Sequence, residues 1–206
     1  TKKIIIFMPS IEGGGVEKNL FIVSSFLGRI FSDVSLITSS KSYNNRFKNI
    51  EVINPLINFE KKRSRILKYI SCLITLLYFI IFKKNVVVFS FQANLYCIIV
   101  CKLCGCKIIT RSNSSPSGWS KNFLKKILYK KILSWADTIM VNSKEFQKEF
   151  KKEFNINAEC IYNPLDKIEI VKKSFFRAKK IFASKKYLKI ITVGRFVDQK
   201  DQITIL

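Results

Sequence analysis

The chain has 206 residues, enough for one well-buried domain but too few for two complete α/β domains. Apolar residues make up 48% of it and 18 residues are Phe, which excludes an intrinsically disordered chain. Lys and Arg number 37 against 14 Asp and Glu, and the formal net charge of +23 favours anionic partners such as phosphates, nucleic acid or an anionic membrane, unless a general compositional bias accounts for it.

Strand and helix patterns alternate along the chain. The opening run KKIIIFMPS is typical of a strand buried on both faces of a parallel sheet, and Gly13, Gly14 and Gly15 lead from it into a helix over 16–28, which Gly28 can end. Further strands are expected at 33–39, 49–53, 86–91, 106–111, 138–143 and from 158, with a polar connection at 41–48 and helices at 66–82, 93–103, 121–135 and 144–154. This alternation predicts an α/β fold with a doubly wound, Rossmann-like parallel sheet.

The order of these patterns also predicts the domain organisation. Residues 1–166 form the first domain, which ends in a turn at Asn163 and Pro164. The Lys-rich stretch 167–186 is a linker, partly helical, and YLKIITVGRF begins the strand of a second domain at 187–206. The sequence stops inside the helix expected after that strand, so we expect it to be part of a longer protein.

Residues 66–82 form the longest apolar run, with Lys68 as its only charge. Its length is at the short limit for crossing a bilayer, and a strand pattern follows within a few residues. A helix packed on the sheet or lying at a membrane surface is favoured, and an integral membrane protein remains an alternative.

The six cysteines include the pair Cys101 and Cys104 at C-x-x-C spacing. Cys97, Cys101 and Cys104 fall at helical spacing in an apolar run, where thiols pack like other small apolar side chains. The chain has no His and no second C-x-x-C pair, so buried free cysteines are favoured over a zinc site. Free thiols without a visible signal peptide indicate a reducing cytoplasm.

A basic amphipathic helix is expected at 121–135, where apolar residues recur at helical intervals among five Lys. Such a helix can lie on anionic lipid, at the inner face of the cell membrane. It can equally pack its apolar stripe against the sheet.

Two segments have the residue types that bind phosphate. The loop EGGGVEKNL brings backbone N–H groups to the start of a helix, where an anion is stabilised by free donors and by the helix dipole. Its three adjacent glycines do not have the G-x-G-x-x-G spacing, and Thr38 to Ser40 stand where a nicotinamide-binding strand ends in an acid, which disfavours that cofactor. In VGRFVDQKDQ, Arg195 and Lys200 follow a buried strand and can neutralise a diphosphate.

Taken in order, EGGGVEKNL, TRSNSSP, ADTIMVNS, YNPLD and ITVGRFVDQKD resemble glycosyltransferase family four, whose members are retaining enzymes of the GT-B fold. The resemblance runs through essentially the whole chain. It implies that the chain is the N-terminal half of a GT-B glycosyltransferase, which transfers a hexose or N-acetylhexosamine from a nucleotide sugar to a glycan or lipid-linked acceptor, without a metal or other cofactor.

The resemblance assigns roles to individual residues. Gly13, Gly14, Gly15, Arg195 and Lys200 match the positions that bind the donor phosphates. Glu17, Arg111 and Asn113 are expected to contact the acceptor or the sugar. The family often has a catalytic His, which this chain lacks, so no catalytic residue is named. The paired glutamates of its donor domain are also absent, and we expect the chain alone to be inactive. The alternative function is a basic Rossmann-like module that binds nucleic acid or an anionic membrane, although no known nucleic-acid motif is present.

Overall fold

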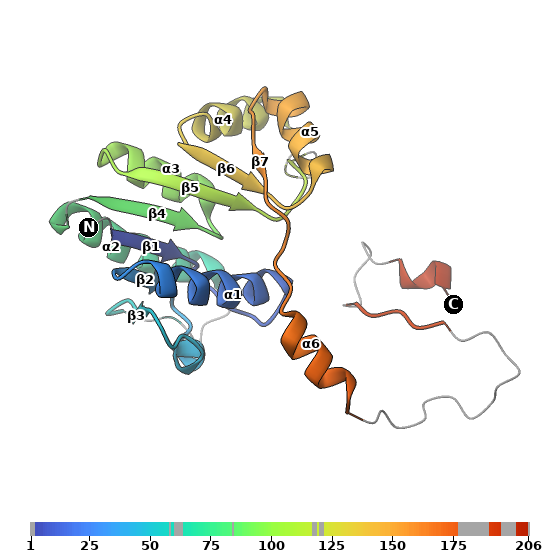
Figure 1. Ribbon diagram of the computed structural model, residues 1–206. Helices are drawn as coiled ribbons and strands as arrows, with labels where there is room; N and C mark the ends of the chain where they lie inside the picture. Colours follow the sequence, from blue (N-terminus) through green and yellow to red (C-terminus); the bar gives the residue numbers. More distant parts are fainter. Residues whose placement is uncertain are drawn as a thin grey trace, which may run out of the picture. The chain divides into compact units, whose positions relative to one another are not determined.

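The computed structural model describes residues 3–57, 59, 64–83, 85–116, 119, 122–176, 190–194 and 201–205. The chain divides into two compact units, Thr1–Leu165 and Asp166–Leu206. The first unit holds one sheet of seven strands in the order β3-β2-β1-β4-β5-β6-β7, and every neighbouring pair is parallel (Figure 1). The predicted α/β fold with a doubly wound parallel sheet is therefore confirmed.

The strands form where short apolar, β-branched runs occur in the sequence. Their bounds are β1 Lys3–Phe7, β2 Val34–Ile37, β3 Glu51–Ile53, β4 Val86–Ser90, β5 Lys107–Ser112, β6 Thr138–Val141 and β7 Glu159–Cys160. Ile5, Ile6 and Phe7 of the central strand β1 are fully buried, although neighbouring side chains point to opposite faces of the sheet. A strand covered on both faces needs apolar residues without alternation, which is why β1 reads as an unbroken run.

Five helices cover the two faces of this sheet: α1 Gly15–Ile30, α2 Arg65–Phe82, α3 Asn94–Leu103, α4 Phe123–Leu133 and α5 Lys144–Phe154. Leu20 of α1 packs with Ile6 and Leu36 in the core on one face. Helices α2 to α5 each contribute buried apolar residues to a larger core on the other face (Figure 1). The result is a three-layer α/β/α arrangement.

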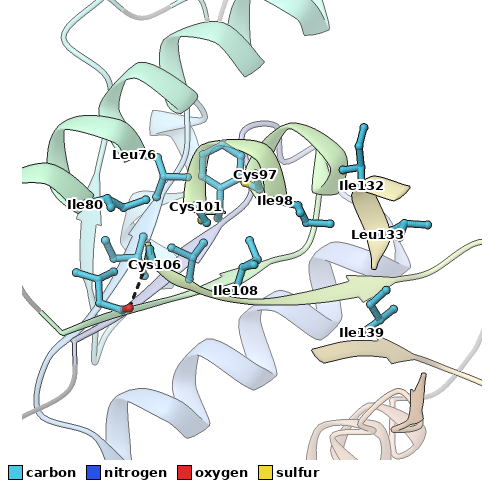
Figure 2. Close-up of a cluster of buried hydrophobic side chains, with 14 of the residues drawn as sticks. Leu76, Ile80, Cys97, Ile98, Cys101, Cys106, Ile108, Ile132, Leu133 and Ile139 are labelled. Atoms are coloured by element: carbon cyan, nitrogen blue, oxygen red, sulfur yellow. Dashed lines mark hydrogen bonds between the residues drawn. The ribbon is translucent and has the colours of Figure 1, made fainter. Parts of the chain in front are cut away.

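The larger core contains most of the cysteines. Cys97 and Cys101 of α3 are fully buried between Leu76 of α2 and Ile132 of α4 (Figure 2). The Cys106 thiol donates a hydrogen bond of 3.1 Å to the Val86 carbonyl, drawn as a dashed line in Figure 2. All six cysteines are free, and burial raises the pKa of the Cys72 thiol to about 12. These thiols thus act as apolar packing residues, as their helical spacing predicts.

The prediction that Gly28 ends the first helix is wrong. Helix α1 continues to Ile30, and its last turn is closed by Phe31, whose N–H donates to the Leu27 carbonyl at 2.8 Å. A Cβ atom on Gly28 would lie 2.3 Å from the backbone oxygen of Asn49. Glycine is needed there because the helix touches the connection that enters β3, a contact between distant parts of the sequence.

The polar connection predicted at 41–48 contains a short 3-10 helix, η1 Lys41–Arg46. It is held by tertiary contacts rather than by its own sequence pattern. The rings of Tyr43 and Phe47 lie with their centroids 6.2 and 5.0 Å from that of Phe21 on α1, and the Arg46 guanidinium lies 5.3 Å from the same ring.

In the second unit, the predicted linker at 167–186 begins with helix α6 Lys167–Ser174, and residues 177–189 lie outside the described residues. Asp166 caps α6 by accepting from the Glu169 N–H at 2.9 Å. The described residues 190–194 form no strand, in contrast to the sequence expectation, and Val193 is 92% exposed. A buried parallel strand needs neighbours to pair with, and the described part of this unit offers none; its other element is η4 Gln202–Ile205.

Among the helices that the structure describes, α2 is the one long and apolar enough to cross a membrane. Its 18 residues have a mean hydropathy of 1.8, and 22% of them are buried. Cys72, Leu76 and Ile80 are the apolar residues that it contributes to the core, so that much of its remaining apolar surface is exposed.

Candidate functional site

Polar residues gather at the edge where the strands end, which we call the carboxyl edge. Strand β1 pairs with β2 on one side and with β4 on the other. The chain therefore leaves β1 and β4 in opposite directions across the sheet. In open parallel sheets such a reversal opens a crevice at the carboxyl ends of the strands, where ligands bind. A ligand site is therefore expected at the loops that follow β1 and β4.

The glycine loop after β1 has the backbone geometry of an anion-binding turn. Gly13 has a φ of +84°, a conformation that other residues adopt only with strain. Gly15 begins α1, and no atom lies within 4 Å of the position that a Cβ would take there. Residues 12–15 are exposed, so the start of α1 presents the positive end of the helix dipole at the surface.

Glu17 accepts hydrogen bonds from backbone N–H groups of this turn. Its carboxylate accepts hydrogen bonds from the N–H of Gly14 at 2.8 Å and of Glu12 at 3.3 Å. A carboxylate in the first turn of α1 satisfies donors that a phosphate could otherwise use. An anionic ligand at this loop must therefore share the donors with Glu17 or displace its side chain. The predicted contact of Glu17 with the acceptor or sugar stays a prediction.

Glu12 ties the same loop to the start of α2. Arg65 donates from Nη2 and Nε to the two carboxylate oxygens of Glu12, at 2.7 and 3.2 Å. The hydrogen bond from Arg65 lowers the pKa of Glu12, and the one to Glu12 raises the pKa of Arg65. The charge of Glu12 is thus compensated by Arg65, whereas Glu17 occupies donors at the start of α1.

The loop after β4 is joined to that of β1 and to β5 by hydrogen bonds. The Ser10 N–H donates to Gln92 Oε1 at 3.0 Å. Ser90 Oγ donates to Asn94 Oδ1 at 2.8 Å, and Asn94 Nδ2 donates to the Arg111 carbonyl at 3.0 Å. Sequence reasoning missed Gln92 and Asn94. The signal was the polar sequence SFQAN directly after a buried strand.

Arg111 at the end of β5 is 2% exposed. Its Nη2 donates to the Ile161 carbonyl at 3.1 Å and to Asn163 Oδ1 at 2.9 Å, and its Nε has no partner. Burial lowers its pKa, and no carboxylate in the described part of the chain pairs with it. Arg111 therefore secures the segment after β7 and places an uncompensated positive charge beneath the carboxyl edge. Its predicted contact with the acceptor or the sugar stays a prediction.

Asn113 and Asn142 follow the neighbouring strands β5 and β6. Both side chains are partly exposed, and the Oδ1 atom of each is buried with no hydrogen-bond partner in the described structure. Buried amide oxygens are normally satisfied, and a ligand hydroxyl is a suitable donor for them. Asn113 was predicted as a contact residue from the sequence. Asn142 was missed, although an Asn directly after a buried strand was the available signal.

Arg195 and Lys200, the predicted donor-phosphate cations, lie outside the described residues. The glycine loop, the Gln92 network and the two asparagines all belong to the first unit, Thr1–Leu165. The site in that unit comprises an open helix start, a buried cation and unsatisfied acceptors. Such a set can bind an anionic group together with a hydroxyl-rich one.

No protein-family model matches this chain, and no curated protein matches it. Solved structures do. HepE of Anabaena, in complex with UDP and glucose, superposes with a TM-score of 0.57 at 13% identity over 81% of this chain and 45% of that one. The lipopolysaccharide outer core galactosyltransferase WaaB, in its apo form, gives a TM-score of 0.50 at 14% identity over 80% of this chain and 46% of that one. The chain has the fold of part of these proteins and spans less than half the length of each.

Proposed function

We propose that this chain is the acceptor-side half of a glycosyltransferase, which transfers a sugar from a nucleotide donor. The observation that carries the proposal is the carboxyl edge itself, with an open helix start, the buried Arg111 and the unsatisfied oxygens of Asn113 and Asn142 in one unit. The fold agrees with it, since HepE of Anabaena was solved with UDP-glucose and matches with a TM-score of 0.53. The motif resemblance to family four adds a retaining mechanism to the proposal.

The motif resemblance assigns donor-phosphate binding to two segments, and each is proposed by itself. The start of α1 stabilises one phosphate through backbone N–H groups and the helix dipole. Arg195 and Lys200 supply cations to the diphosphate and to the charge that develops on it as the sugar leaves. Because side chains and helix donors supply this charge, the proposal requires no metal ion. We also propose that the enzyme acts in the cytoplasm, where nucleotide sugars are the donors, and at the inner face of the cell membrane.

The proposed acceptor is a glycan or a lipid-linked sugar, as in the assembly of surface polysaccharide or lipopolysaccharide. Rotation of the Asn113 or Asn142 side chain would let its Oδ1 atom, which is buried without a partner in the described structure, accept from a sugar hydroxyl. Saturation-transfer NMR of the purified chain with a panel of hexoses, N-acetylhexosamines and short glycans tests this part. We expect a signal from some of these sugars that is lost in Asn113→Ala and in Asn142→Ala.

Asn49→Ala is the matched control, because Asn49 is an exposed asparagine that precedes β3 at the opposite edge of the sheet. A sugar signal that survives both Asn113→Ala and Asn142→Ala would overturn the acceptor assignment. For transfer, we expect negligible turnover of radiolabelled nucleotide sugars by the chain alone, because the paired glutamates of family four are not among its residues. Robust turnover would refute this expectation. Tight binding of nucleic acid in a gel-shift assay, without any sugar signal, would favour the basic binding module instead.

A further inference from the structure

Helix α2 presents a continuous apolar stripe on the side that faces away from the sheet. Cys72, Leu76 and Ile80 are buried in the core. On the opposite side, Ile74 is 64% and Ile81 is 61% exposed. A surface helix of a water-soluble domain ordinarily places polar residues there. The outer side of α2 is instead as apolar as its inner side.

Helix α4 extends this surface. Helix α3 contacts both α2 and α4, and all three contribute residues to the core on the same face of the sheet (Figure 1). Leu124 is 73% and Ile127 is 49% exposed on α4, whereas its Ile132 and Leu133 point into the core. We call the exposed side chains of Ile70, Ile74, Tyr78 and Ile81 on α2, with Leu124 and Ile127 on α4, the outer apolar face.

The charged residues within α2, α3 and α4 are all basic. No Asp or Glu occurs between Glu60 and Asp137, a stretch that contains α2, α3 and α4, whereas fifteen Lys and Arg do. Lys125, Lys130 and Lys131 are exposed on α4 itself. Lys126 of α4 pairs with Glu153 of the neighbouring helix α5 at 2.8 Å. An exposed apolar side combined with basic residues and no acidic ones is typical of helices that lie on anionic lipid.

A hollow adjoins the C-terminal end of α2. Its volume is about 570 Å³, and its lining combines Ile80 and Ile81 with Lys83 and Lys107. Apolar side chains and two lysines thus line the same hollow. An anionic lipid is complementary to this lining, because its acyl chains match the apolar side chains and its phosphate matches the lysines.

We propose that the outer apolar face lies flat on the surface of a bilayer that contains anionic lipid. A spanning α2 is disfavoured because the helix would have to withdraw Cys72, Leu76 and Ile80 from the core. A second copy of the chain is disfavoured because a symmetric contact would bring cations against cations. Nucleic acid would satisfy the lysines but would leave the exposed Ile and Tyr side chains in contact with phosphates. This inference goes beyond the proposed sugar transfer and does not depend on it.

Flotation of the purified chain with vesicles tests the inference. We expect binding to vesicles of phosphatidylcholine with phosphatidylglycerol, and much weaker binding to phosphatidylcholine alone. Ile74→Glu should weaken binding to the mixed vesicles on the order of tenfold or more, because it places a carboxylate in the inserted face. Phe26→Glu is the matched control, since Phe26 is 59% exposed on α1, on the other face of the sheet, and the change in charge is comparable. Circular dichroism verifies that both variants fold.

Several results would overturn the inference. They are equal binding to both kinds of vesicle, no binding to either, or equal losses in Ile74→Glu and Phe26→Glu. Bound chain should be released by alkaline carbonate, and resistance to it would mean that α2 spans the bilayer. The remaining alternative is that a second copy of the chain covers the outer apolar face, and sedimentation of the chain without vesicles tests it. An oligomer that Ile74→Glu dissociates would show that a second copy covers this face.

Discussion

Gly28→Ala is a strong test of how α1 packs, because two effects of opposite sign act on it. In an open helix position, replacing Gly by Ala stabilises a protein by about 1 kcal/mol. At Gly28 the added Cβ would lie 2.3 Å from Asn49 O and 2.7 Å from a side-chain carbon of Ile50. Relief of this overlap requires the helix or the connection to move by roughly 1 Å, and such overpacking costs about 1–3 kcal/mol or more.

We therefore expect Gly28→Ala to reduce the free energy of unfolding by about 1–2 kcal/mol, or the Tm by roughly 2–8 °C for a unit of this size. Chemical denaturation and thermal melting monitored by circular dichroism measure both quantities. Gly15→Ala is the control, because it makes the same change in the same helix with no atom within 4 Å. It should leave stability unchanged or raise it slightly. A Gly28→Ala chain more stable than the parent would refute the close approach of α1 to the β3 connection.

Three further predictions concern single contacts. Burial alone would raise the pKa of Asp137, but hydrogen bonds from Lys102 at 2.6 Å and from a backbone N–H of β5 lower it. The contribution of Asp137 to the free energy of unfolding is therefore fully present above its unfolded pKa of about 3.9, and it is lost as the pH falls through the lower folded pKa. Asp137→Asn should cost about 1 kcal/mol or less at neutral pH, since the pair is partly exposed, and should flatten the acid end of the stability profile measured by urea denaturation. Arg111→Met should raise deuterium uptake in the segment after β7 several-fold while changing global stability by only about 1 kcal/mol, because the lost hydrogen bonds are offset by removal of a buried charge; unchanged uptake would contradict the anchoring role. In native protein, iodoacetamide should modify the partly exposed Cys160 well before the buried Cys72, whose raised pKa keeps it protonated, and mass spectrometry after a short pulse reports the order.

The sheet was predictable because local patterns and tertiary structure agree along most of the first unit. The unbroken apolar run of β1 and the helical spacing of Cys97 and Cys101 each show, within one short segment, that the segment is buried. Candidate site residues at the ends of strands, such as Asn113, could also be predicted from the sequence, because parallel strands place their carboxyl ends at one edge.

The remaining features depend on contacts between distant segments. Gly28 resembled a helix terminator because the sequence does not show that Asn49 approaches it. The roles of Gln92 and Asn94 arise because β4 pairs with β1, in a register that places Ser90 opposite Phe7. The anchoring role of Arg111 could not be predicted, because its partners Ile161 and Asn163 lie about fifty residues further along the chain.

The distribution of charge links the proposed site to the proposed membrane surface. The two carboxylates nearest the glycine loop, Glu12 and Glu17, are engaged by Arg65 and by the start of α1, while Arg111 has no acidic partner in the described residues. The carboxyl edge therefore stays favourable for an anion, as does the outer apolar face with its lysines. Salt should weaken binding at both places, since exposed charges are screened beyond about 8 Å at physiological ionic strength. Ile74→Glu should weaken vesicle binding while leaving the sugar signal at Asn113 and Asn142 intact. A variant that lost both together would mean that the two surfaces are one site, and that the separation drawn between them is wrong.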